Sequence, residues 1–497
     1  MKTNHSLAFL LKGLEYSILQ GNIDKDVTGI YNDSRKIEKD SLFFCISGAK
    51  VDGHEFASEV MQKGASVLIV EKEVEAPEYV TVILVANTRY AMAFISAAYF
   101  DHPASKLKTI GITGTKGKTT TTYLVKSILE QTGKKVGLIG TIETIIADEH
   151  IKANNTTPES YILQESFAKM VEAGLDTVVM EVSSQGLMLH RTQGFIFDYG
   201  IFTNLAPDHI GPDEHESFEQ YLMCKSLLFQ QCKVGIVNGD DEYTDAILKN
   251  STCKVLRFGL DNKNDIIASG ITLINEAGQL GVGFDFTQLN EKEKHDFKVE
   301  VATPGTFSVY NALTAIAICL QFKVDYKSIQ KALLNAHVKG RIELIKVSNE
   351  FSLMIDYAHN AMSLESLLTT LKEYKPKRLV SVFGCGGNRA KSRRYEMGEV
   401  SGRLADLTVI TSDNPRFEEP QEIIDDIKIG MNKTQGEYVE ITDRKDAIKY
   451  VIQNGKAGDI IVLAGKGHED YQEIKGVKYP MDERVLIKEV LEELAIL

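Results

Sequence analysis

The segment from Thr113 to Thr120, TGTKGKTT, combines glycines, lysines and hydroxyl side chains in a spacing suited to binding phosphate. It follows the apolar run TIGI and precedes the helical pattern KTTTTYLVKSILEQ, so we expect a strand-to-helix turn. Backbone N–H groups and the positive helix end would face an anion there. Lys118 would reach the phosphates, and the Thr119 hydroxyl could bind Mg²⁺. The predicted ATP-binding set from this loop is Gly114, Thr115, Lys116, Gly117, Lys118, Thr119 and Thr120.

The spacing of this loop departs from the usual phosphate-binding pattern, which has a glycine, four residues and then Gly-Lys-Ser/Thr. Counting back from Gly117 places Ile112, rather than a glycine, at the first position. A glycine-containing turn without a ligand is therefore the alternative interpretation. We favour an ATP site because the Gly-Lys-Thr triplet stands where the helix must begin. The motif alone does not name a reaction.

The elements that must position this loop belong to three successive runs of strands and helices. Residues 1–107 contain the predicted strands SLFFCIS, ASVLIVE and VTVILVAN and the predicted helices HEFASEVMQKGA and RYAMAFISAAYF. From residue 108, TIGITG, KVGLIGT, TVVMEVSS, FDYGIFTNL and VGIVNGDD predict strands, and NALTAIAICLQF predicts a helix. The last run has strands at FSLMIDYAH, RLVSVFGCGG, LTVITSDNPR and DIIVLAGKG. This alternation predicts an α/β fold with mostly parallel sheets, which bind ligands at the carboxyl ends of their strands.

Composition limits the possible functions of the chain. Its 497 residues suggest roughly three domains, and its net charge of −13 argues against nucleic-acid binding. The six cysteines form no C-x-x-C pair or Cys/His metal spacing, which indicates free thiols in a reducing compartment. No apolar run reaches a membrane span of ~18 residues, and MKTNHSLAFLLKGLEYSIL is interpreted as an amphipathic helix rather than a signal peptide. We therefore expect a cytoplasmic protein without membrane insertion.

Several longer motifs follow one another in a family-specific order. They are DSR at 33–35, GITGTKGKTTT at 111–121, MEVSSQGLMLHR at 180–191, TNLAPDH at 203–209, DYAHN at 356–360, DNPR at 413–416 and GKGHED at 465–470. With these motifs the sequence resembles the Mur ligases over nearly its whole length. The resemblance implies a three-domain architecture. It has an N-terminal UDP-binding domain at 1–107, a central P-loop parallel-sheet ATPase domain at 108–338 and a Rossmann-like amino-acid-binding domain at 339–497.

The resemblance also implies an activity, that of an ATP-dependent ligase adding the third residue of the peptidoglycan stem peptide. ATP would phosphorylate the free carboxylate of UDP-N-acetylmuramoyl-L-alanyl-D-glutamate to an acyl phosphate, which the amine of the incoming amino acid attacks. That amino acid is either meso-2,6-diaminopimelate or L-lysine. Because anionic groups must meet, Mg²⁺ and lysines are needed to neutralise charge. We expect the enzyme to act as a monomer.

The resemblance implies a catalytic group consisting of Lys118, Glu181, His209 and Lys225. Its implied Mg²⁺ ligands are Thr119, Glu181, His209 and Lys225. Lys225 aligns with the lysine that is carbamylated in this family, and carbamylation (to N6-carboxylysine) makes the side chain an anion able to hold Mg²⁺. Without the family context, Lys225 would be interpreted as a solvated helix lysine.

Further nucleotide contacts are implied outside the loop. Asn311 in SVYNALTAI resembles the adenine contact of the family. Contacts from the C-terminal domain are implied for Arg341, Asp356 and His359. Domain closure over ATP would exclude water from a hydrolysable acyl phosphate.

For the UDP-dipeptide, the resemblance implies a set rich in hydroxyl and amide groups, with Arg191 suited to a carboxylate. The set is Asn32, Ser34, Ala49, Lys50, Val51, Asn155, Thr156, Thr157, Ser183, Leu189 and Arg191. The DNPR motif favours diaminopimelate over lysine, because the Arg416 fork can hold the extra carboxylate through two hydrogen bonds. The implied diaminopimelate contacts are Arg394, Asp413, Asn414, Pro415, Arg416, Gly465 and Glu469.

Two positions depart from the commonest family pattern. Asn388 in GCGGNR stands where many relatives have Asp, and PDHIGPDEH replaces the commoner D-H-L-D-Y-H form after His209. The remaining alternatives are a folylpolyglutamate synthetase-like ligase and a P-loop switch or assembly ATPase without ligase activity. The first should lack the N-terminal UDP-binding domain and DNPR, and the second would hydrolyse ATP without any amino acid.

Overall fold

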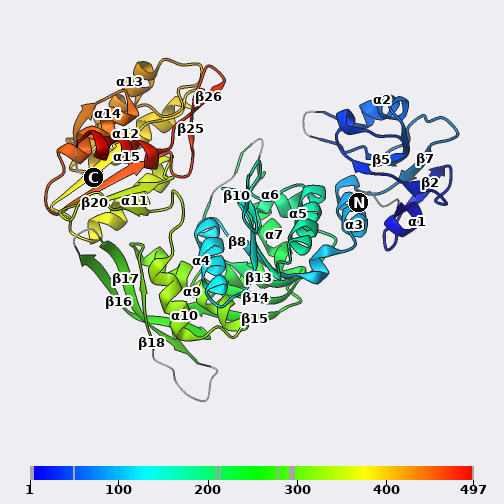
Figure 1. Ribbon diagram of the computed structural model, residues 1–497, viewed down its shortest axis with the longest axis horizontal. Coiled ribbons are helices and arrows are strands. Elements are labelled where there is room, and N and C mark those ends of the chain that lie inside the picture. Colours follow the sequence, from blue (N-terminus) through cyan, green and yellow to red (C-terminus); the bar gives the residue numbers. More distant parts are fainter. Residues whose placement is uncertain are drawn as a thin grey trace. The chain divides into compact units, whose positions relative to one another are not determined.

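The computed structural model describes residues 5–48, 51–207, 210–211, 214–276, 279–289 and 297–494. The chain divides into two compact units. The first comprises Met1–Asp265 with Thr314–Val324, and the second comprises Ile266–Leu313 with Asp325–Leu497. Figure 1 shows helices and strands in both units. The three domain boundaries expected from the sequence stay a prediction.

The N-terminal residues of the first unit form a small sheet with helices packed against it. The elements are β1 (His5–Ser6), α1 (Leu7–Leu10), β2 (Ser17–Gln20), β3 (Asp26–Val27), β4 (Ile30–Tyr31), η1 (Ser34–Lys36), β5 (Ser41–Phe44), η2 (Gly53–Phe56), α2 (Ala57–Gln62), β6 (Ala65–Val70), β7 (Thr81–Leu84), α3 (Thr88–Tyr99) and η3 (Pro103–Lys106). Their main sheet has the order β2-β7-β6-β5-β4, parallel except for β2. Apolar side chains cover both faces of this sheet.

The rest of the first unit is built on a larger parallel sheet. Its elements are β8 (Lys108–Thr113), α4 (Lys118–Gln131), β9 (Val136–Ile139), β10 (Glu143–Ile146), β11 (Glu149–Lys152), α5 (Ser160–Glu172), β12 (Thr177–Glu181), α6 (Ser184–Met188), β13 (Phe197–Phe202), α7 (Phe218–Ser226), η4 (Leu227–Gln230), β14 (Cys232–Asn238), α8 (Thr244–Leu248) and β15 (Lys254–Gly259). The order is β11-β10-β9-β12-β8-β13-β14-β15. The strands from β9 to β15 in this order run parallel, which explains why most of them read as apolar runs buried on both faces; β15, whose first residues are exposed, is the exception.

The second unit contains an antiparallel ribbon and a second parallel sheet. Its elements are β16 (Ile266–Glu276), β17 (Gln279–Gln288), β18 (Phe297–Val301), α9 (Thr306–Gln321, shared with the first unit), α10 (Tyr326–Asn335), β19 (Glu343–Ile345), β20 (Ser352–Asp356), α11 (Ala361–Glu373), β21 (Arg378–Phe383), α12 (Lys391–Leu404), β22 (Leu407–Ile410), α13 (Pro420–Met431), β23 (Glu437–Glu440), α14 (Arg444–Gln453), β24 (Asp459–Ala464), β25 (Tyr471–Ile474), β26 (Val477–Pro480) and α15 (Glu483–Glu493). The sheet order is β19-β20-β24-β21-β22-β23, with only β19 antiparallel. Separate apolar clusters cover its two faces.

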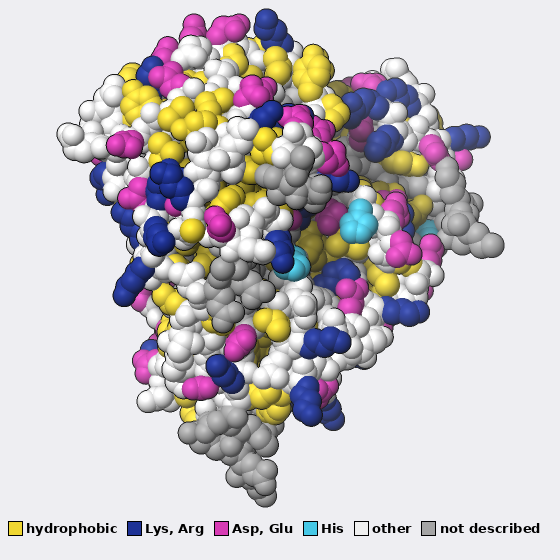
Figure 2. All heavy atoms as spheres, turned by 60° about the vertical axis from the view of Figure 1, so that its left-hand side comes forward, with side chains coloured by type: hydrophobic (Ala, Val, Ile, Leu, Met, Phe, Trp, Pro, Cys, Tyr) yellow, Lys and Arg dark blue, Asp and Glu magenta, His cyan; other side chains and the backbone are white. Residues whose placement is uncertain are grey.

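The surface in Figure 2 carries basic and acidic side chains interspersed with apolar ones. On the face shown, no continuous basic surface of the kind that binds nucleic acid is visible. Within the described residues, no helix is both long enough and apolar enough to cross a membrane. All six cysteines are free thiols, as expected from their spacing.

The predicted strands and the α/β class are confirmed, but two expectations about local structure need correction. The expected N-terminal amphipathic helix is wrong except for a single turn. The helix α1 spans only Leu7–Leu10, Gly13 adopts a left-handed φ of 84°, and the chain then enters strand β2. The sequence analysis also missed the antiparallel strands β16 to β18, whose long half-exposed ribbon lacks the short apolar runs that mark parallel strands.

Candidate active site

The predicted phosphate loop lies between the central strand β8 and the helix α4, as expected. Strand β8 is flanked by β12 and β13 in parallel register, so the loop lies at the carboxyl edge of the sheet. Gly114 has a φ of 150°, and a Cβ there would lie 2.0 Å from the Thr203 hydroxyl at the end of β13. Gly117, with a φ of 86°, precedes the first residue of α4. Both glycines are therefore required by the backbone path of the loop.

Two lysines meet at one carbonyl of this loop. The Lys118 ammonium donates to the Gly114 carbonyl at 2.8 Å and to the Thr115 carbonyl at 3.1 Å. Lys225, buried near the end of α7, donates to the same Gly114 carbonyl at 2.9 Å and lies 4.4 Å from the Tyr221 ring centroid. The two ammonium groups thus concentrate positive charge where a phosphate would be held.

A buried carboxylate lies beside the first turn of α4. Glu181, at the end of β12, accepts a hydrogen bond from the Thr119 hydroxyl at 3.0 Å. It also accepts from the Thr141 backbone N–H at 2.8 Å and from the Thr141 hydroxyl at 3.0 Å. A hydroxyl and a carboxylate in contact are hard oxygen ligands, so they fit Mg²⁺, which combines few protein ligands with water and phosphate oxygens. Among the described residues, no cluster of three or more His, Cys, Asp or Glu side chains suits a metal ion.

The residues predicted to bind the UDP-dipeptide begin immediately next to this carboxylate. Thr157 donates its hydroxyl to the Glu181 carbonyl at 3.0 Å and accepts from the Ser183 backbone N–H at 2.9 Å. Arg191 donates to the Thr157 carbonyl at 3.0 Å and to Glu159 at 2.7 Å. Since Glu159 already holds the Arg191 guanidinium, a substrate carboxylate would have to share or exchange this contact.

The other predicted contacts for the UDP-dipeptide are more dispersed. The Thr156 hydroxyl lies 3.1 Å from that of Thr141, whereas Asn155 is exposed and Leu189 is half-buried. In the N-terminal sheet region, Ser34 opens η1, Asn32 lies just before it, and Val51 is exposed. Ala49, Lys50 and the predicted metal ligand His209 lie outside the described residues.

The second unit brings the predicted nucleotide contacts Arg341 and Asp356 close together. Asp356 ends β20 and accepts hydrogen bonds from the Ile342 and Ala358 backbone N–H groups at 2.8 and 2.9 Å. Burial raises the pKa of the Asp356 carboxyl, and the nearby Arg341 charge opposes that shift. The Arg341 guanidinium lies 5.0 Å from the ring centroid of Tyr357. His359 is exposed, and Asn311 is buried within α9.

Strand β24 carries the GKGHED motif to the same edge of this sheet. It pairs with β20 in parallel register, and the Gly465 backbone N–H donates to the Asp356 carbonyl at 3.0 Å. A Cβ at Gly340 would lie 2.1 Å from the backbone nitrogen of His468, so only glycine permits this approach. Burial and the Arg341 charge lower the pKa of His468 to about 4. Residues assigned to the nucleotide and to the amino acid are therefore neighbours in this unit.

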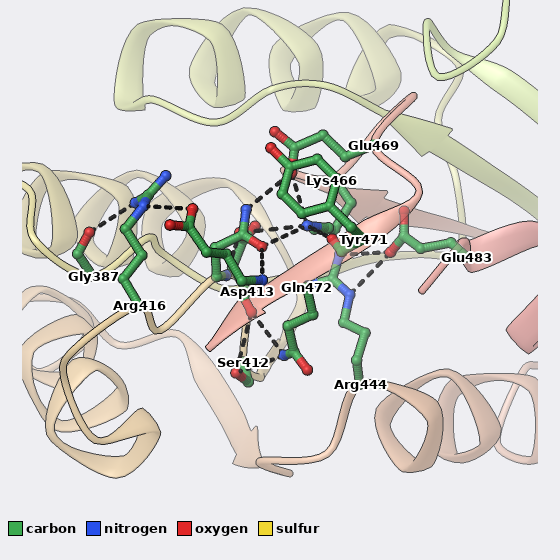
Figure 3. A network of polar contacts seen from close by, with 12 residues as sticks. Gly387, Ser412, Asp413, Arg416, Arg444, Lys466, Glu469, Tyr471, Gln472 and Glu483 are labelled. Carbon is green, nitrogen blue, oxygen red and sulfur yellow. Dashed lines mark hydrogen bonds and ion pairs between the residues drawn. The ribbon is translucent and has the colours of Figure 1, made fainter. Parts of the chain in front are cut away.

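A connected polar network surrounds the predicted diaminopimelate contacts (Figure 3). The buried Lys466 ammonium donates to Asn414 Oδ1 at 3.0 Å and to Glu469 Oε2 at 2.8 Å. Asn414 Nδ2 donates to the same Glu469 oxygen at 2.9 Å. Burial of Glu469 opposes ionisation, but the Lys466 charge and these hydrogen bonds together lower the pKa of Glu469. Asp413 is close by, 3.1 Å from where a Cβ of Gly465 would lie.

Arg416 lies at one side of this network, with a left-handed φ of 53° that follows Pro415. Its Nη1 donates to the Gly387 carbonyl at 2.7 Å, and its Nε donates to Glu473 on β25 at 3.2 Å. The Arg416 backbone N–H also donates to the Glu473 carbonyl at 2.9 Å. A guanidinium has more N–H donors than these contacts use, so Arg416 can still bind a ligand carboxylate.

Arg394, another predicted diaminopimelate contact, is buried and bound by two carboxylates. Its Nη1 donates at 2.8 Å to both Glu418 and Asp426, and its Nη2 donates to Glu418 at 2.7 Å. The hydrogen bond from Arg394 lowers the pKa of Glu418 to about 2. Because Glu418 follows Arg416 closely in the chain, this geometry favours an indirect role for Arg394, in which it anchors the DNPR loop.

Sequence reasoning missed several residues at this site. Lys466 lies inside the GKGHED motif, yet only Gly465 and Glu469 were singled out there. Glu473 lies outside every motif, and its contacts with Arg416 in the structure reveal it. Arg389 was also overlooked, although its Cγ and the Arg416 Nη1 both border the position of a Cβ at Gly386, at 3.9 and 2.8 Å.

Comparison with known proteins matches this geometry to one family. The chain matches the Mur ligase family catalytic domain at residues 26–100, the Mur ligase middle domain at 112–319 and the Mur ligase glutamate ligase domain at 340–467. A protein of Caldanaerobacter subterraneus subsp. tengcongensis is 44% identical, over 98% of this chain and 99% of its own length. The chain belongs to the Mur ligase family. That relative is named UDP-N-acetylmuramoyl-L-alanyl-D-glutamate--2,6-diaminopimelate ligase.

A second relative and a solved structure carry the same name as the first relative. A Clostridium tetani protein with the same name is 42% identical, over 98% of the chain and 99% of that relative. A solved structure of a UDP-N-acetylmuramoyl-L-alanyl-D-glutamate--2,6-diaminopimelate ligase has a TM-score of 0.74 and 28% identity, and the match covers 99% of this chain and 100% of that one. The three-domain architecture expected for the family is thus supported over the full length.

We predict that Arg394→Ala destabilises the protein, because Glu418 loses its cation and the buried Asp426 keeps only its ion pair with the exposed Lys391. Breaking a buried ion pair costs roughly 3–5 kcal/mol, and the partial exposure of Glu418 points to the lower end of that range. Urea unfolding at neutral pH measures the loss, with the exposed neighbouring variant Arg393→Ala as the control. Equal unfolding midpoints for the two variants would show that this ion pair does not anchor the loop.

Proposed function

We propose that this Mur ligase joins meso-2,6-diaminopimelate to UDP-N-acetylmuramoyl-L-alanyl-D-glutamate at the expense of ATP, in peptidoglycan precursor synthesis. The observation that carries the proposal is the Arg416 guanidinium beside the Asn414–Glu469 pair, at the carboxyl ends of β22 and β24. This arrangement offers a cation and an anion to one zwitterionic amino-acid end. The nearly full-length relatives with this name add independent support.

The reaction requires an ordered sequence of charge neutralisation. The loop backbone and Lys118 hold the phosphates of ATP while the substrate carboxylate attacks the terminal phosphorus, releasing ADP and leaving an acyl phosphate. The amine of the amino acid then attacks the acyl carbon, and phosphate leaves from the tetrahedral intermediate. Glu181 and Thr119 would hold Mg²⁺, which neutralises phosphate charge. The protein mainly positions the groups and stabilises charge, as phosphoryl transfer requires.

Lys225 is proposed to work in its carbamylated form. As an ammonium, it is buried against the Gly114 carbonyl and the Tyr221 ring, where burial disfavours a charged group. Carbon dioxide adds to the neutral amine to form a carbamate, and the proton lost from nitrogen goes to water. The resulting anion could then contribute to the cation site beside Glu181.

Selection between diaminopimelate and lysine is proposed to depend on Arg416. The structure lowers the discrimination against lysine that we expect from Arg416. Glu473 and the Gly387 carbonyl keep Arg416 paired when no ligand carboxylate is present. Lysine is therefore rejected mainly because it lacks the carboxylate that would bind Arg416, and not because Arg416 would be left without a partner. A charge-assisted hydrogen bond contributes about 1.5–3 kcal/mol, which corresponds to roughly tenfold to a hundredfold discrimination.

The alternatives are less well supported. A folylpolyglutamate synthetase should lack the residues before 107 and the DNPR loop, whereas the named relatives align over both. A switch or assembly ATPase gives no reason for the polar network around Lys466. We also propose the three domains at 1–107, 108–338 and 339–497, and each of the three family matches falls within one of them. The free thiols support a cytoplasmic location.

We predict that the purified protein releases phosphate only when ATP, the UDP-dipeptide and meso-diaminopimelate are all present. L-Lysine should be used roughly tenfold to a hundredfold less efficiently in kcat/KM, and Arg416→Ala should reduce this preference by a similar factor. Coupled phosphate release with product mass spectrometry measures both. Incorporation of lysine but not diaminopimelate would refute the substrate assignment, and hydrolysis without an amino acid would refute the ligase.

Lys118→Ala should lower kcat for ligation by roughly a hundredfold or more, because a preorganised cation at the phosphates is lost. The thermal melting curve should stay close to that of the wild type, since the Gly114 carbonyl that Lys118 contacts keeps its hydrogen bond from Lys225. Lys134→Ala, an exposed lysine just beyond α4, is the matched control. Retention of wild-type kcat in Lys118→Ala would remove this residue from the mechanism.

Carbamylation of Lys225 predicts a mass increase of one carbon dioxide on the peptide that contains it, in protein kept under bicarbonate at alkaline pH. Lys225→Ala should lose ligation, and short-chain carboxylates should partly restore activity by supplying the missing anion. An unmodified Lys225 in fully active protein would contradict the proposal.

A further inference from the structure

Lys466 is a fully buried charged side chain whose contacts are arranged as a tripod. Its ammonium donates to Asn414 Oδ1 at 3.0 Å, to Glu469 Oε2 at 2.8 Å and to the Tyr471 carbonyl at 2.6 Å. An ammonium has three N–H donors, so these three acceptors use its full capacity. Lys466 has an exposed side-chain fraction of 0%, so these protein contacts, rather than water, must stabilise its charge.

These contacts fix the orientation of two neighbouring side chains. Asn414 Oδ1 accepts from Lys466 and also from the Glu473 backbone N–H at 2.9 Å, so its Nδ2 must face the other way. Nδ2 then donates to Glu469 Oε2 at 2.9 Å, the same oxygen that Lys466 holds. Lys466, Asn414 and Glu469 therefore form a closed triangle. The second Glu469 oxygen, Oε1, takes no part in it.

Two acceptors of Lys466, Glu469 and Tyr471, lie close to it in the sequence, whereas the third, Asn414, is distant. Asn414 belongs to the loop after β22, Glu469 follows β24, and Tyr471 begins β25. Arg444, which forms a buried ion pair with Glu483, donates from Nη2 to the Ala464 carbonyl at 3.0 Å, two residues before Lys466 (Figure 3). Lys466 thus connects the DNPR loop to the GKGHED turn at a point held from both sides.

Burying a lysine ammonium is expensive, and well-packed apolar residues often stabilise a fold equally well. Fold stability therefore does not explain why a charged lysine is buried here. The site formed by the two polar side chains that Lys466 orients is a better explanation. Asn414 and Glu469 are the residues assigned above to the amino-acid substrate, and Lys466 itself has no exposed atom with which to touch that substrate. Its effect must act through them.

We propose that Lys466 is a positioning residue for the amino-acid substrate, a role that rests on the proposed function. It holds Asn414 and Glu469 in the orientation in which the Glu469 carboxylate can take the substrate ammonium. Loss of the tripod should weaken binding of the amino acid alone. Sites for ATP and the UDP-dipeptide should be unaffected, since the side-chain hydrogen bonds of Lys466 go to Asn414, Glu469 and the Tyr471 carbonyl and not to the nucleotide residues proposed in this unit.

Steady-state kinetics of Lys466→Met and Lys466→Arg test the proposal. For Lys466→Met, KM for diaminopimelate should rise by about tenfold to a hundredfold, while KM for ATP and for the UDP-dipeptide stays within about twofold. Lys466→Arg keeps the charge but not the tripod geometry, so it should recover part of the loss. Lys475→Met, an exposed lysine at the turn of the β25–β26 hairpin, should match the wild type.

Several outcomes would overturn the proposal. Unchanged kinetics in Lys466→Met, or a rise in all three KM values together, would show that the lysine is only structural. If Lys466→Met does not fold, Lys466→Arg decides, and an unchanged KM for the amino acid in that variant would count against positioning. If the wild type uses L-lysine instead of diaminopimelate, the substrate assignment fails. The same selective rise in KM, measured with L-lysine, would then still support Lys466 as the positioning residue.

Discussion

The parallel register of the central strands is the constraint on which the rest of this enzyme depends. Pairing of β8 with β12 and β13 brings the Gly114 loop, Glu181 and Thr203 to one edge of the first sheet. Pairing of β20 with β24 does the same for Asp356 and the Gly465 turn in the second unit. Carboxyl ends of neighbouring parallel strands meet at one edge, so residues far apart in sequence become neighbours without long loops.

The cations at these edges are already paired with acceptors of the protein. Lys118 donates hydrogen bonds to loop carbonyls, Arg191 donates to Glu159, and Arg416 donates to Glu473. Binding of an anionic ligand at the proposed sites would therefore share or exchange these partners rather than neutralise a bare charge. This exchange avoids the cost of a buried unpaired cation in the free enzyme, and it reduces the affinity that each contact can add. Specificity then depends on several modest contacts that act together.

Much of this organisation could be predicted from the sequence, since the buried strands read as apolar runs and the motifs fall at their ends. The loop around Gly114 and the DNPR segment both lie where the pattern placed them. Ion pairs between residues that are distant in the sequence could not be predicted. No pattern near Arg394 indicates its two carboxylate partners, and Glu473 reaches Arg416 only because the β25–β26 hairpin returns to the DNPR loop. The prediction of a long N-terminal helix was wrong because Gly13 adopts a left-handed backbone conformation, which the apolar periodicity of the segment does not indicate.

The second unit couples the residues proposed for the nucleotide and for the amino acid through the backbone, and the proposed reaction gives a chemical reason for this. The amine must reach a carboxyl carbon just activated by ATP, so the groups that hold the two substrates cannot move independently without losing the near-attack geometry. The Gly465 N–H on the Asp356 carbonyl and the close approach of Gly340 to His468 fix these segments against each other. Lys466 extends that rigid connection to Asn414 and Glu469. If Lys466 positions these residues as proposed, a side chain without contact to the substrate determines how precisely the amino acid is presented.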